Sequence, residues 1–563
     1  MDLSRQPDGH NISQENAAPD HNADLDWKPR REENLIMMCL SLVTLIVALD
    51  ATILVPALPI ISHALNGNAV LTFWAGTSYL LTSAVFQPFL GALSDIFGRR
   101  EILFLSLSLF TIGTLVCCTA NNFTSLLAGR SIKGIGGGGI IAMVLVVLTD
   151  IVPLRQRPKY TSYVQVTLAF GTISGPLIGG AIVQHLTWRW LFYLSFPFCG
   201  IGLALIPFVV KLKKQKTTFI NMFLHVDWLG SFLFIGSTTS FLIAITWGGV
   251  QFPWGSYQTL VPLLIGIAGC VVTVFWEKWG AKFPFVRLSI FKARSAYAAY
   301  FCAMTQGLLL YAELYYLSFY LQAIKFLSPI MNGIALLPIT CGILPVSVLV
   351  GILITKFGRF RWSVWAGWIV SILATGLLCL LDVETSTVSY IFIFLTVGVG
   401  HGLLLSSLSF TVQAIASSQD VAYAAVLYAF VRGVGFCLGV ALGGTVFQNF
   451  LARYLDMAGL PKSIASDAEG FVAVLKDLPG SQYKNDLLWA YATAFKSLFA
   501  ILTGLSALGG MASLTISSHA MNKALDSEHM LRPVGLENIE GGLDNGEGRL
   551  GKGEGKETSG AVQ

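Results

Sequence analysis

A short polar turn occurs twice in this chain, each time between two long apolar segments. The turns span residues 91–100 and 351–361, and each places a Gly-Arg pair seven residues after another glycine. Lipid offers no hydrogen-bond partners to a backbone that leaves a helix, so turns this short between apolar segments belong at a membrane surface. The repetition therefore predicts a duplicated bundle of membrane-spanning helices.

The composition indicates that most of the chain is embedded in lipid. Of its 563 residues, 54% are hydrophobic and only 12% are charged, whereas soluble domains carry about 25% charged residues. A spanning helix needs about 20 apolar residues, and on that measure the sequence divides into about fourteen spans. The predicted fold class is an all-α integral membrane protein.

Lysine and arginine residues gather in every second connection between the predicted spans, except the connection near residues 414–421, which holds none. Cations beside membrane spans stay on the cytoplasmic side, so this alternation predicts that both termini are cytoplasmic. Among the intervening short connections, only Lys325 carries a positive charge. The cation-rich connections lie at residues 99–100, 155–159, 211–216, 282–294 and 356–361.

A second pattern also repeats between the two halves of the chain. Glycines recur every four residues in the fifth predicted span and again in the thirteenth, a spacing that lets a neighbouring helix backbone approach closely. If spans seven and eight are an insertion, the glycine-rich spans and the two turns occupy equivalent places in two six-helix halves. The glycines are Gly171, Gly175 and Gly179 in the fifth span and Gly435, Gly439 and Gly443 in the thirteenth.

These repeats predict a bundle of two six-helix halves plus two accessory helices, with 14 transmembrane helices in all.

The C-terminal tail is rich in Gly and Glu and poor in apolar residues, which is typical of disorder. The expected parts are a disordered N-terminus (1–33), a first six-helix bundle (34–210), an accessory two-helix insertion with flanking loops (211–295), a second six-helix bundle (296–516) with a long outer loop (447–492), and a disordered cytoplasmic tail (517–563).

Several short motifs are similar to those of a known transporter family. The turn at residues 91–100, residues 49–52 in the first span, Arg130 with Gly134, and residues 171–180 resemble motifs of the major facilitator superfamily. The number of spans resembles its fourteen-span drug:proton antiporters, in particular fungal multidrug and toxin efflux pumps. Lys133 departs from the family motif, in which glutamine is common, and adds a charge beside Arg130.

The resemblance implies a fold of the superfamily type and a function. That function is proton-coupled secondary active efflux, or antiport, of small amphipathic organic compounds such as drugs, toxins or secondary metabolites, by alternating access. The implied partners are a small-molecule substrate, protons and membrane lipids, with no nucleic acid, and a monomer is expected to be functional. The implied location is the plasma membrane, with a vacuolar or vesicular membrane as the alternative.

The energy source follows from what the sequence lacks. It contains no complete Gly-x4-Gly-Lys-[Ser/Thr] phosphate loop, which argues against ATP-driven pumping. We therefore expect no cofactor and no metal, a proton gradient as the energy source, and a secondary transporter rather than an enzyme. Two alternatives remain open: a proton-coupled importer of a nutrient or metal chelate, and a sensor or receptor with a transporter fold.

Three ionisable residues of the first half are expected to lie within the membrane. Asp50 falls in the first span, and Arg130 and Lys133 fall in the fourth at a similar depth. An intramembrane charge costs about 2.5–3.5 kcal/mol on insertion scales and usually marks a pathway or a pair. We predict that Asp50 binds and releases the coupling proton while the two cations stabilise its charged form. The alternative is a static ion pair that only holds the helices together.

Glu313 in the ninth span is the second candidate proton-coupling residue. Aromatic residues flank it and favour a cavity wall for flat amphipathic substrates, although an interfacial aromatic belt with Glu313 reaching toward water is the alternative. Arg432 in the thirteenth span is expected to hold an anionic group or to pair with Glu313, and His401 is interpreted as a packing residue. The predicted substrate-cavity residues are Tyr311, Tyr315, Tyr316, Phe319 and Arg432.

A further group of residues is expected to control conformational change. The resemblance implies that Asp95 contacts the start of the thirteenth helix, near Asp420, when the cytoplasmic side is closed. Pro176 lacks a backbone donor and predicts a bend at an interface between the halves. The predicted gating residues are Gly91, Asp95, Gly98, Arg99, Arg100, Gly171, Gly175, Pro176 and Gly179.

Overall fold

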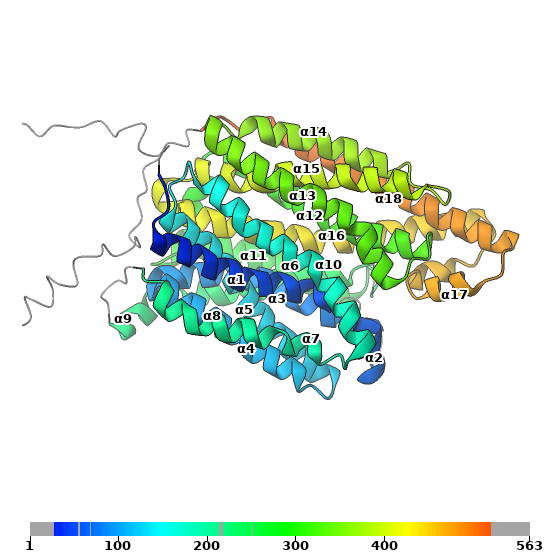
Figure 1. Ribbon diagram of the computed structural model, residues 1–563, viewed down its shortest axis with the longest axis horizontal. Helices are drawn as coiled ribbons and strands as arrows, with labels where there is room; N and C mark the ends of the chain where they lie inside the picture. The colour runs from blue at the N-terminus through cyan, green and yellow to red at the C-terminus, as the bar shows by residue number, and fades with distance from the viewer. Residues whose placement is uncertain (1–26, 55–56, 68, 213–217, 250, 520–563) are drawn as a thin grey trace, which may run out of the picture.

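The computed structural model describes residues 27–54, 57–67, 69–212, 218–249 and 251–519, which form a bundle of long, roughly parallel helices (Figure 1). The predicted disorder of the two termini lies outside these residues, apart from positions 27–33 and 517–519. The N-terminal end of α1 and the C-terminal end of α18 lie at the same end of the bundle (Figure 1). We call this the inner end, and the opposite end, which carries residues 458–481, the outer end.

The first half of the bundle is built from the segments that precede residue 210. Its helices are α1 (Arg31–Ile53), α2 (Leu58–Ala64), α3 (Ala69–Phe97), α4 (Arg99–Cys118), α5 (Phe123–Ile151), α6 (Arg157–His185), α7 (Trp190–Tyr193) and α8 (Ser195–Val209).

The second half follows an insertion of shorter and accessory helices. The insertion contains α9 (Phe219–Leu224), α10 (Trp228–Trp247), α11 (Tyr257–Phe275), η2 (Trp276–Gly280) and η3 (Leu288–Lys292). The second half contains α12 (Arg294–Ala323), α13 (Pro329–Phe357), α14 (Arg361–Leu378), α15 (Thr387–Ile415), η4 (Ser418–Asp420), α16 (Val421–Met457), η5 (Lys462–Asp467), α17 (Phe471–Asp477) and α18 (Gln482–Ser513).

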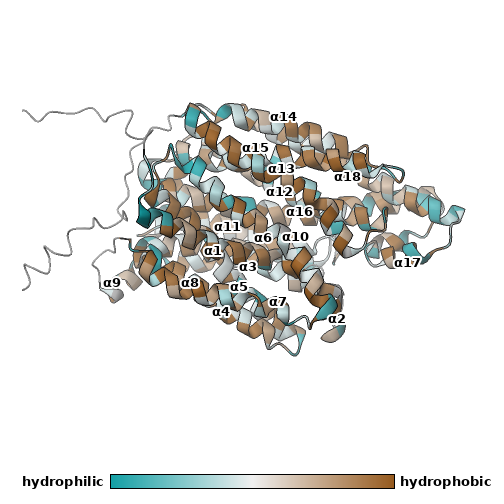
Figure 2. Cartoon of the chain, in the orientation of Figure 1, coloured by the Kyte–Doolittle hydropathy of each residue, from teal (hydrophilic) through white to brown (hydrophobic). Residues whose placement is uncertain are grey.

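The described helices account for the predicted membrane spans. Thirteen of them are long and apolar enough to cross a membrane. The 30-residue α12 is less apolar because it carries Gln306, Glu313 and several tyrosines, yet it packs within the second half against α16 and α18. With α12 included, the helices match the predicted fourteen spans. Hydrophilic residues gather at the two ends of the bundle and hydrophobic residues cover its length, as a membrane protein requires (Figure 2).

The buried apolar residues fall into clusters that follow the two halves. The largest cluster draws on residues 290–516, and two others draw on residues 36–226 and 49–192. Val426 of α16 joins a first-half cluster because it packs against Gly91 of α3, where a Cβ atom would lie only 3.0 Å from the valine. The accessory helix α10 also packs against α3 and α16, and α11 packs against α10. The halves therefore share a seam along α3 and α16, with the accessory pair attached beside it.

The repeated glycines bring pairs of helices into close contact within each half. Gly175 and Gly179 of α6 face α1, and a Cβ atom on Gly179 would lie 2.2 Å from the carbonyl oxygen of Ile53. Gly439 of α16 faces α12 in the same way, with Leu308 O at 2.2 Å. The glycine-bearing faces of α6 and α16 thus pack inside their own halves. The prediction instead placed a bend of the α6 segment, at Pro176, at an interface between the halves.

The opposite side of α6 does reach the second half. Gly180 lies against Ile330, and Pro176 lies beside Gly333 of α13. Gly180 and Pro176 therefore contact the second half, while Gly171, Gly175 and Gly179 pack against α1 within the first half. The reason is geometric, because residues four apart share one helix face and Pro176 projects from another.

The predicted outer loop at residues 447–492 is wrong in extent. The helix α16 continues to Met457 and α18 begins at Gln482, so the connection is shorter and contains η5 and α17. Buried apolar residues explain both extensions: Phe447, Leu451 and Leu455 recur every four residues along α16, and Leu487 and Tyr491 do so on α18. The remaining predicted domain boundaries stay predictions.

The α12–α16 crossing should not tolerate even one added methyl group. We expect Gly439→Ala to lower the free energy of unfolding by about 1–3 kcal/mol, because the new Cβ overlaps a backbone carbonyl that cannot move alone. Gly504→Ala on α18 is the matched control, since nothing lies within 4 Å of its Cβ position. Thermal unfolding of both purified variants in detergent checks this, and equal midpoints would contradict it.

Candidate functional site

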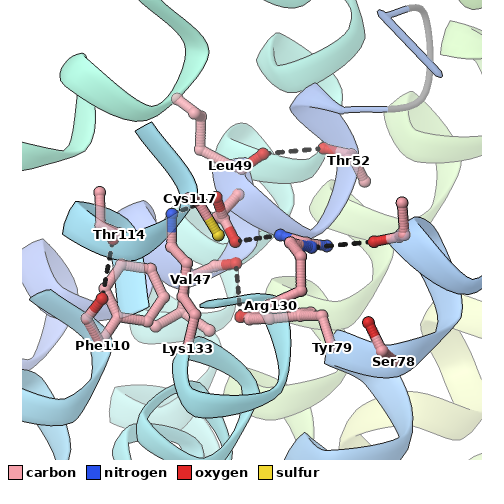
Figure 3. Close-up of polar contacts among 12 residues, drawn as sticks. Val47, Leu49, Thr52, Ser78, Tyr79, Phe110, Thr114, Cys117, Arg130 and Lys133 are labelled. Carbon is pink, nitrogen blue, oxygen red and sulfur yellow. Dashed lines mark hydrogen bonds and ion pairs between the residues drawn. The ribbon is translucent and has the colours of Figure 1, made fainter. Parts of the chain in front are cut away.

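The structure brings the three ionisable residues of the first half together. Asp50 of α1 accepts hydrogen bonds from Arg130 at 2.8 Å and from Lys133 at 2.5 Å, both on α5 (Figure 3). Each of the three side chains is at most 1% exposed. The cations lie three residues apart on one face of α5, which is the helical spacing that lets two side chains reach one partner.

Aromatic rings and a backbone carbonyl complete the surroundings of the two cations. Arg130 Nε donates to the carbonyl oxygen of Ala75 at 3.0 Å, and its guanidinium lies 4.5 Å from the ring centre of Tyr79 (Figure 3). Lys133 Nζ lies 4.6 Å from the ring centre of Phe110. The faces of aromatic rings attract cations, so these contacts offset part of the excess positive charge.

The first-half cluster, defined as Asp50, Arg130 and Lys133, has a net charge of +1 when all three groups are ionised. Removing one partner from a buried ion pair costs about 3–5 kcal/mol because the other charge is left without compensation. Protonating Asp50 would leave two buried cations in that condition. The geometry thus confirms that the three residues meet, while the proton-binding role of Asp50 and the alternative of a static ion pair both stay predictions.

The second half contains its own buried acid, and its partner is a histidine. Glu313 Oε2 on α12 lies 2.8 Å from His401 Nε2 on α15. The other ring nitrogen, Nδ1, lies 3.4 Å from the side-chain nitrogen of Gln306. Both Glu313 and His401 are 1% exposed. No ion pair joins Glu313 to Arg432 in the described part of the chain.

Arg432 occupies a different environment from the one predicted. Its guanidinium donates to Tyr428 Oη at 3.4 Å and lies 5.3 Å from the ring centre of Phe436. The sequence offered Glu313 as its partner because both residues lie in the membrane, but His401 is nearer to the acid. Arg432 is also absent from the lining of the cavity described next.

A cavity of about 380 Å³ lies between α3, α10, α12 and α16, toward the outer end. Four of the five predicted cavity residues, Tyr311, Tyr315, Tyr316 and Phe319, line it. Rings and aliphatic side chains form most of its wall, with a few polar groups, which is the usual character of small-molecule sites. The accessory helix takes part through Thr246. Trp74, Leu81, Gln251, Phe436, Val440, Phe447 and Gln448 also line the cavity.

The outer connection contributes two carboxylates to the same cavity. Asp467 and Glu469 are lining residues, and Tyr315 Oη donates to Glu469 Oε1 at 2.8 Å. Desolvation within the protein raises the pKa of Glu469, and the hydrogen bond from Tyr315 opposes this only in part. The Glu469 carboxyl therefore keeps its proton to a higher pH than a fully hydrated glutamate does. Sequence reasoning missed this contribution because nothing in the outer connection marks it as part of a cavity.

The inner end of the bundle is closed by polar contacts between the halves. Arg287, which precedes η3, lies 3.6 Å from Asp95 of α3 and 3.3 Å from Asp420 at the start of α16. Arg157 donates to Gln413 at 3.4 Å across the same seam. Asp95 and Asp420 are therefore close, as predicted, because the cation Arg287 lies between them. Sequence reasoning missed Arg287, although two carboxylates expected to lie close together indicate that a cation lies between them.

The predicted gating turn is held by Asp150, another carboxylate that sequence reasoning missed. Arg99 donates to Asp150 at 2.9 Å and also pairs with Asp95 at 2.5 Å. Gly98 has a positive φ of 104°, a conformation that only glycine adopts without strain. Arg100 lies at the surface beside Glu101 at 3.2 Å. The turn thus anchors Asp95 where Arg287 reaches it, while no ion pair or hydrogen bond found among the described residues joins Arg100 to the second half.

Neutralising Asp50 should destabilise the fold rather than leave it intact. We expect Asp50→Asn to lower the free energy of unfolding by about 3–5 kcal/mol, because two cations remain buried. The double variant Asp50→Asn/Lys133→Met should recover much of this loss. Asp456→Asn is the control, since the exposed pair of Asp456 with Lys462 is worth at most about 1 kcal/mol. Thermal unfolding in detergent checks the order, and an unaffected Asp50→Asn would contradict it.

Removing the bridge at the inner end should make that end open more often. We expect Arg287→Ala to raise the labelling rate of a cysteine placed at Ala92 by about 2–5-fold, as partly exposed ion pairs are worth up to about 1 kcal/mol each. Ala92 lies one helical turn before Asp95 and packs against the second half. Arg100→Ala is the matched control. Peptide mass spectrometry measures labelling of this cysteine alone, and identical rates would refute the role of Arg287.

Known proteins resemble this chain over most of its length. Residues 40–440 match the family model described as Major Facilitator Superfamily. The chain is 44% identical over 495 residues to the MFS transporter L2 of Phoma sp., covering 87% of this chain and 83% of that protein. It is 32% identical to the efflux pump FUS6 of Gibberella fujikuroi, covering 92% of this chain and 95% of that protein.

Solved structures show the same fold. The human organic anion transporter MFSD10 aligns with a TM-score of 0.55 at 14% identity, over 86% of this chain and all of that chain. The proton:xylose symporter XylE aligns with a TM-score of 0.55 at 13% identity, over 87% of this chain and 97% of that chain. The match to the family model and the extended similarity to these relatives show that the chain belongs to the Major Facilitator Superfamily, a family of membrane transporters.

Proposed function

We propose that this protein exports small amphipathic organic compounds, in particular secondary metabolites or toxins, by alternating access driven by a proton gradient. The observation that carries this proposal is the aromatic cavity between the halves, which lies toward the outer end while Arg287 and its partners close the inner end. A cavity in this position can hold a compound that has crossed the membrane and awaits release on the far side.

Named relatives support export as the direction of transport. FUS6 of Gibberella fujikuroi and dotC of Dothistroma septosporum are both called efflux pumps, and each aligns with 92% of this chain. The protein aclA of Aspergillus oryzae is called an MFS efflux transporter. We extend that function to this chain because its relatives with this name match it over both halves.

Proton flow is the energy source that suits the buried ionisable groups. One charge that crosses a potential of 100 mV releases about 2.3 kcal/mol. Asp50 on α1 and Glu313 on α12 are acids buried well inside their helices, one in each half. The cation-rich connections lie at the inner end, which supports a cytoplasmic position for both termini. We place the protein in the plasma membrane, where such export leaves the cell.

Transport by the purified protein tests this function. Cells that overproduce the chain are first screened against a library of aromatic metabolites and dyes, and the compound with the largest gain in resistance is chosen. In proteoliposomes, an imposed pH gradient should drive that compound against its concentration gradient, and a protonophore should abolish the movement. Protein-free liposomes are the control. Movement that ignores the pH gradient would refute the coupling, and resistance to no compound would refute export.

A further inference from the structure

The buried acid of the second half occupies the place that Asp50 occupies in the first. Asp50 stands nineteen residues after Arg31, the first residue of α1, and Glu313 stands nineteen residues after Arg294, the first residue of α12. The glycine-rich α6 packs against α1, and the glycine-rich α16 packs against α12. Each acid also pairs with a base on the helix three spans later in its half, which is α5 or α15.

The bases differ in a way that changes what each site does with a proton. Arginine and lysine are fixed cations near neutral pH, whereas histidine gains and loses its charge between about pH 5 and 8. With an ionised acid and a neutral histidine, the Glu313–His401 pair has a charge of −1, and one proton makes it neutral. In the first-half cluster, a proton on Asp50 would raise the net charge from +1 to +2.

We propose that Glu313 and His401 together form the proton-carrying site of this transporter, with His401 as a direct proton-binding residue. This inference rests on the proposed proton-driven export and assigns its coupling site. One proton from the outer medium joins the pair, either on the imidazole or on the carboxylate, and leaves to the inner medium in the other conformation. Asp50, Arg130 and Lys133 then serve as a fixed structural cluster.

The side chain of Gln306 can change its hydrogen bond when the imidazole of His401 gains or loses a proton. Its side-chain nitrogen lies 3.4 Å from His401 Nδ1, and its oxygen has no hydrogen-bond partner among the described residues. An amide can donate to a neutral ring nitrogen, or rotate and accept from a protonated one. Glu313 Oε1 is likewise buried without a partner in the described chain, so this oxygen is open to a proton.

The nearby charged residues on the surrounding helices contact partners other than Glu313 and His401. Arg432 of α16 is engaged by Tyr428, Lys496 of α18 by Asp382, and Glu469 of the outer connection by Tyr315. The described ion pairs join neither Glu313 nor His401 to a second charge. The other titratable groups along these helices, away from the inner ends, are Cys302, Tyr311, Tyr316 and Tyr320 of α12; Cys341 of α13; Tyr390 of α15; Cys437, Arg453, Tyr454 and Asp456 of α16; and Tyr483, Lys484, Asp486 and Tyr491 of α18.

The test uses the full-length protein without a substrate and follows the closure of the inner end. A cysteine at Ala92 is labelled with a maleimide in detergent at pH values from about 5 to 8, the range in which histidine titrates, and is quantified by peptide mass spectrometry. Rates are divided by those of a model thiol peptide to remove the chemistry of the thiolate. We expect the corrected rate to change roughly tenfold, because a tenfold difference in proton affinity between two conformations shifts their equilibrium by that factor.

Variants assign the titration to the pair. His401→Gln and Glu313→Gln should each flatten the pH profile. Ser363→Ala, which removes a buried hydrogen bond from α14 to Ser407 of α15, should keep the profile. The double variant Asp50→Asn/Lys133→Met should also keep it. A profile that survives in His401→Gln but disappears in the double variant would place the proton in the first-half cluster and overturn the proposal.

A second measurement does not depend on the folding of any variant. Infrared difference spectra of the wild-type protein between the two pH limits should show a buried histidine ring or carboxyl band that titrates together with the labelling rate. The absence of both bands would overturn the proposal. Failure of gradient-driven transport in the wild type, with a pH-dependent closure intact, would instead overturn the proposed function while leaving this site as a pH-sensitive pair.

Discussion

The cost of a charge buried away from water governs the arrangement of both halves. Asp50, Arg130 and Lys133 are almost completely buried and hold α1 to α5, because separating any one of them leaves a charge that costs about 3–5 kcal/mol. Glu313 and His401 hold α12 to α15 at the equivalent place. The same pair of helix positions thus carries a buried acid in both halves, with arginine and lysine as its partners in the first half and histidine as its partner in the second.

The polar contacts that close the inner end differ from the glycine contacts that hold helix pairs together within each half. Inside each half, glycines bring α6 onto α1 and α16 onto α12 at backbone distance, so these pairs cannot slide without steric overlap. Between the halves, Arg287 bridges Asp95 and Asp420 while 39% exposed, and such ion pairs contribute at most about 1 kcal/mol each. The two bundles are thus joined by these polar contacts and by the packing of α6 on α13, where a Cβ atom on Gly351 would lie only 2.6 Å from the carbonyl oxygen of Pro158.

Pattern and charge in the sequence predicted the helices and their order, since apolar length and the two repeats are properties of the chain alone. The same reasoning brought Asp50, Arg130 and Lys133 together, because intramembrane charges must find partners. It offered Arg432 rather than His401 as the partner of Glu313, because the choice among several buried partners depends on which helix faces meet. It also missed Arg287, Asp150 and Glu469, which lie in or beside connections whose paths across the bundle leave no periodic pattern in the sequence.

The accessory helices have a place in this scheme that the count of spans does not reveal. The helix α10 lies against α3 and α16, one of the helix pairs through which the halves meet, and its Thr246 lines the cavity. Trp247 packs edge-on against Trp74 of α3 with ring centres 6.2 Å apart. Arg287, which precedes η3 in the last part of the insertion, lies at the inner end. A segment inserted between the halves therefore contributes both to the wall of the cavity and to the closure beneath it, so any rotation of the halves must change both together.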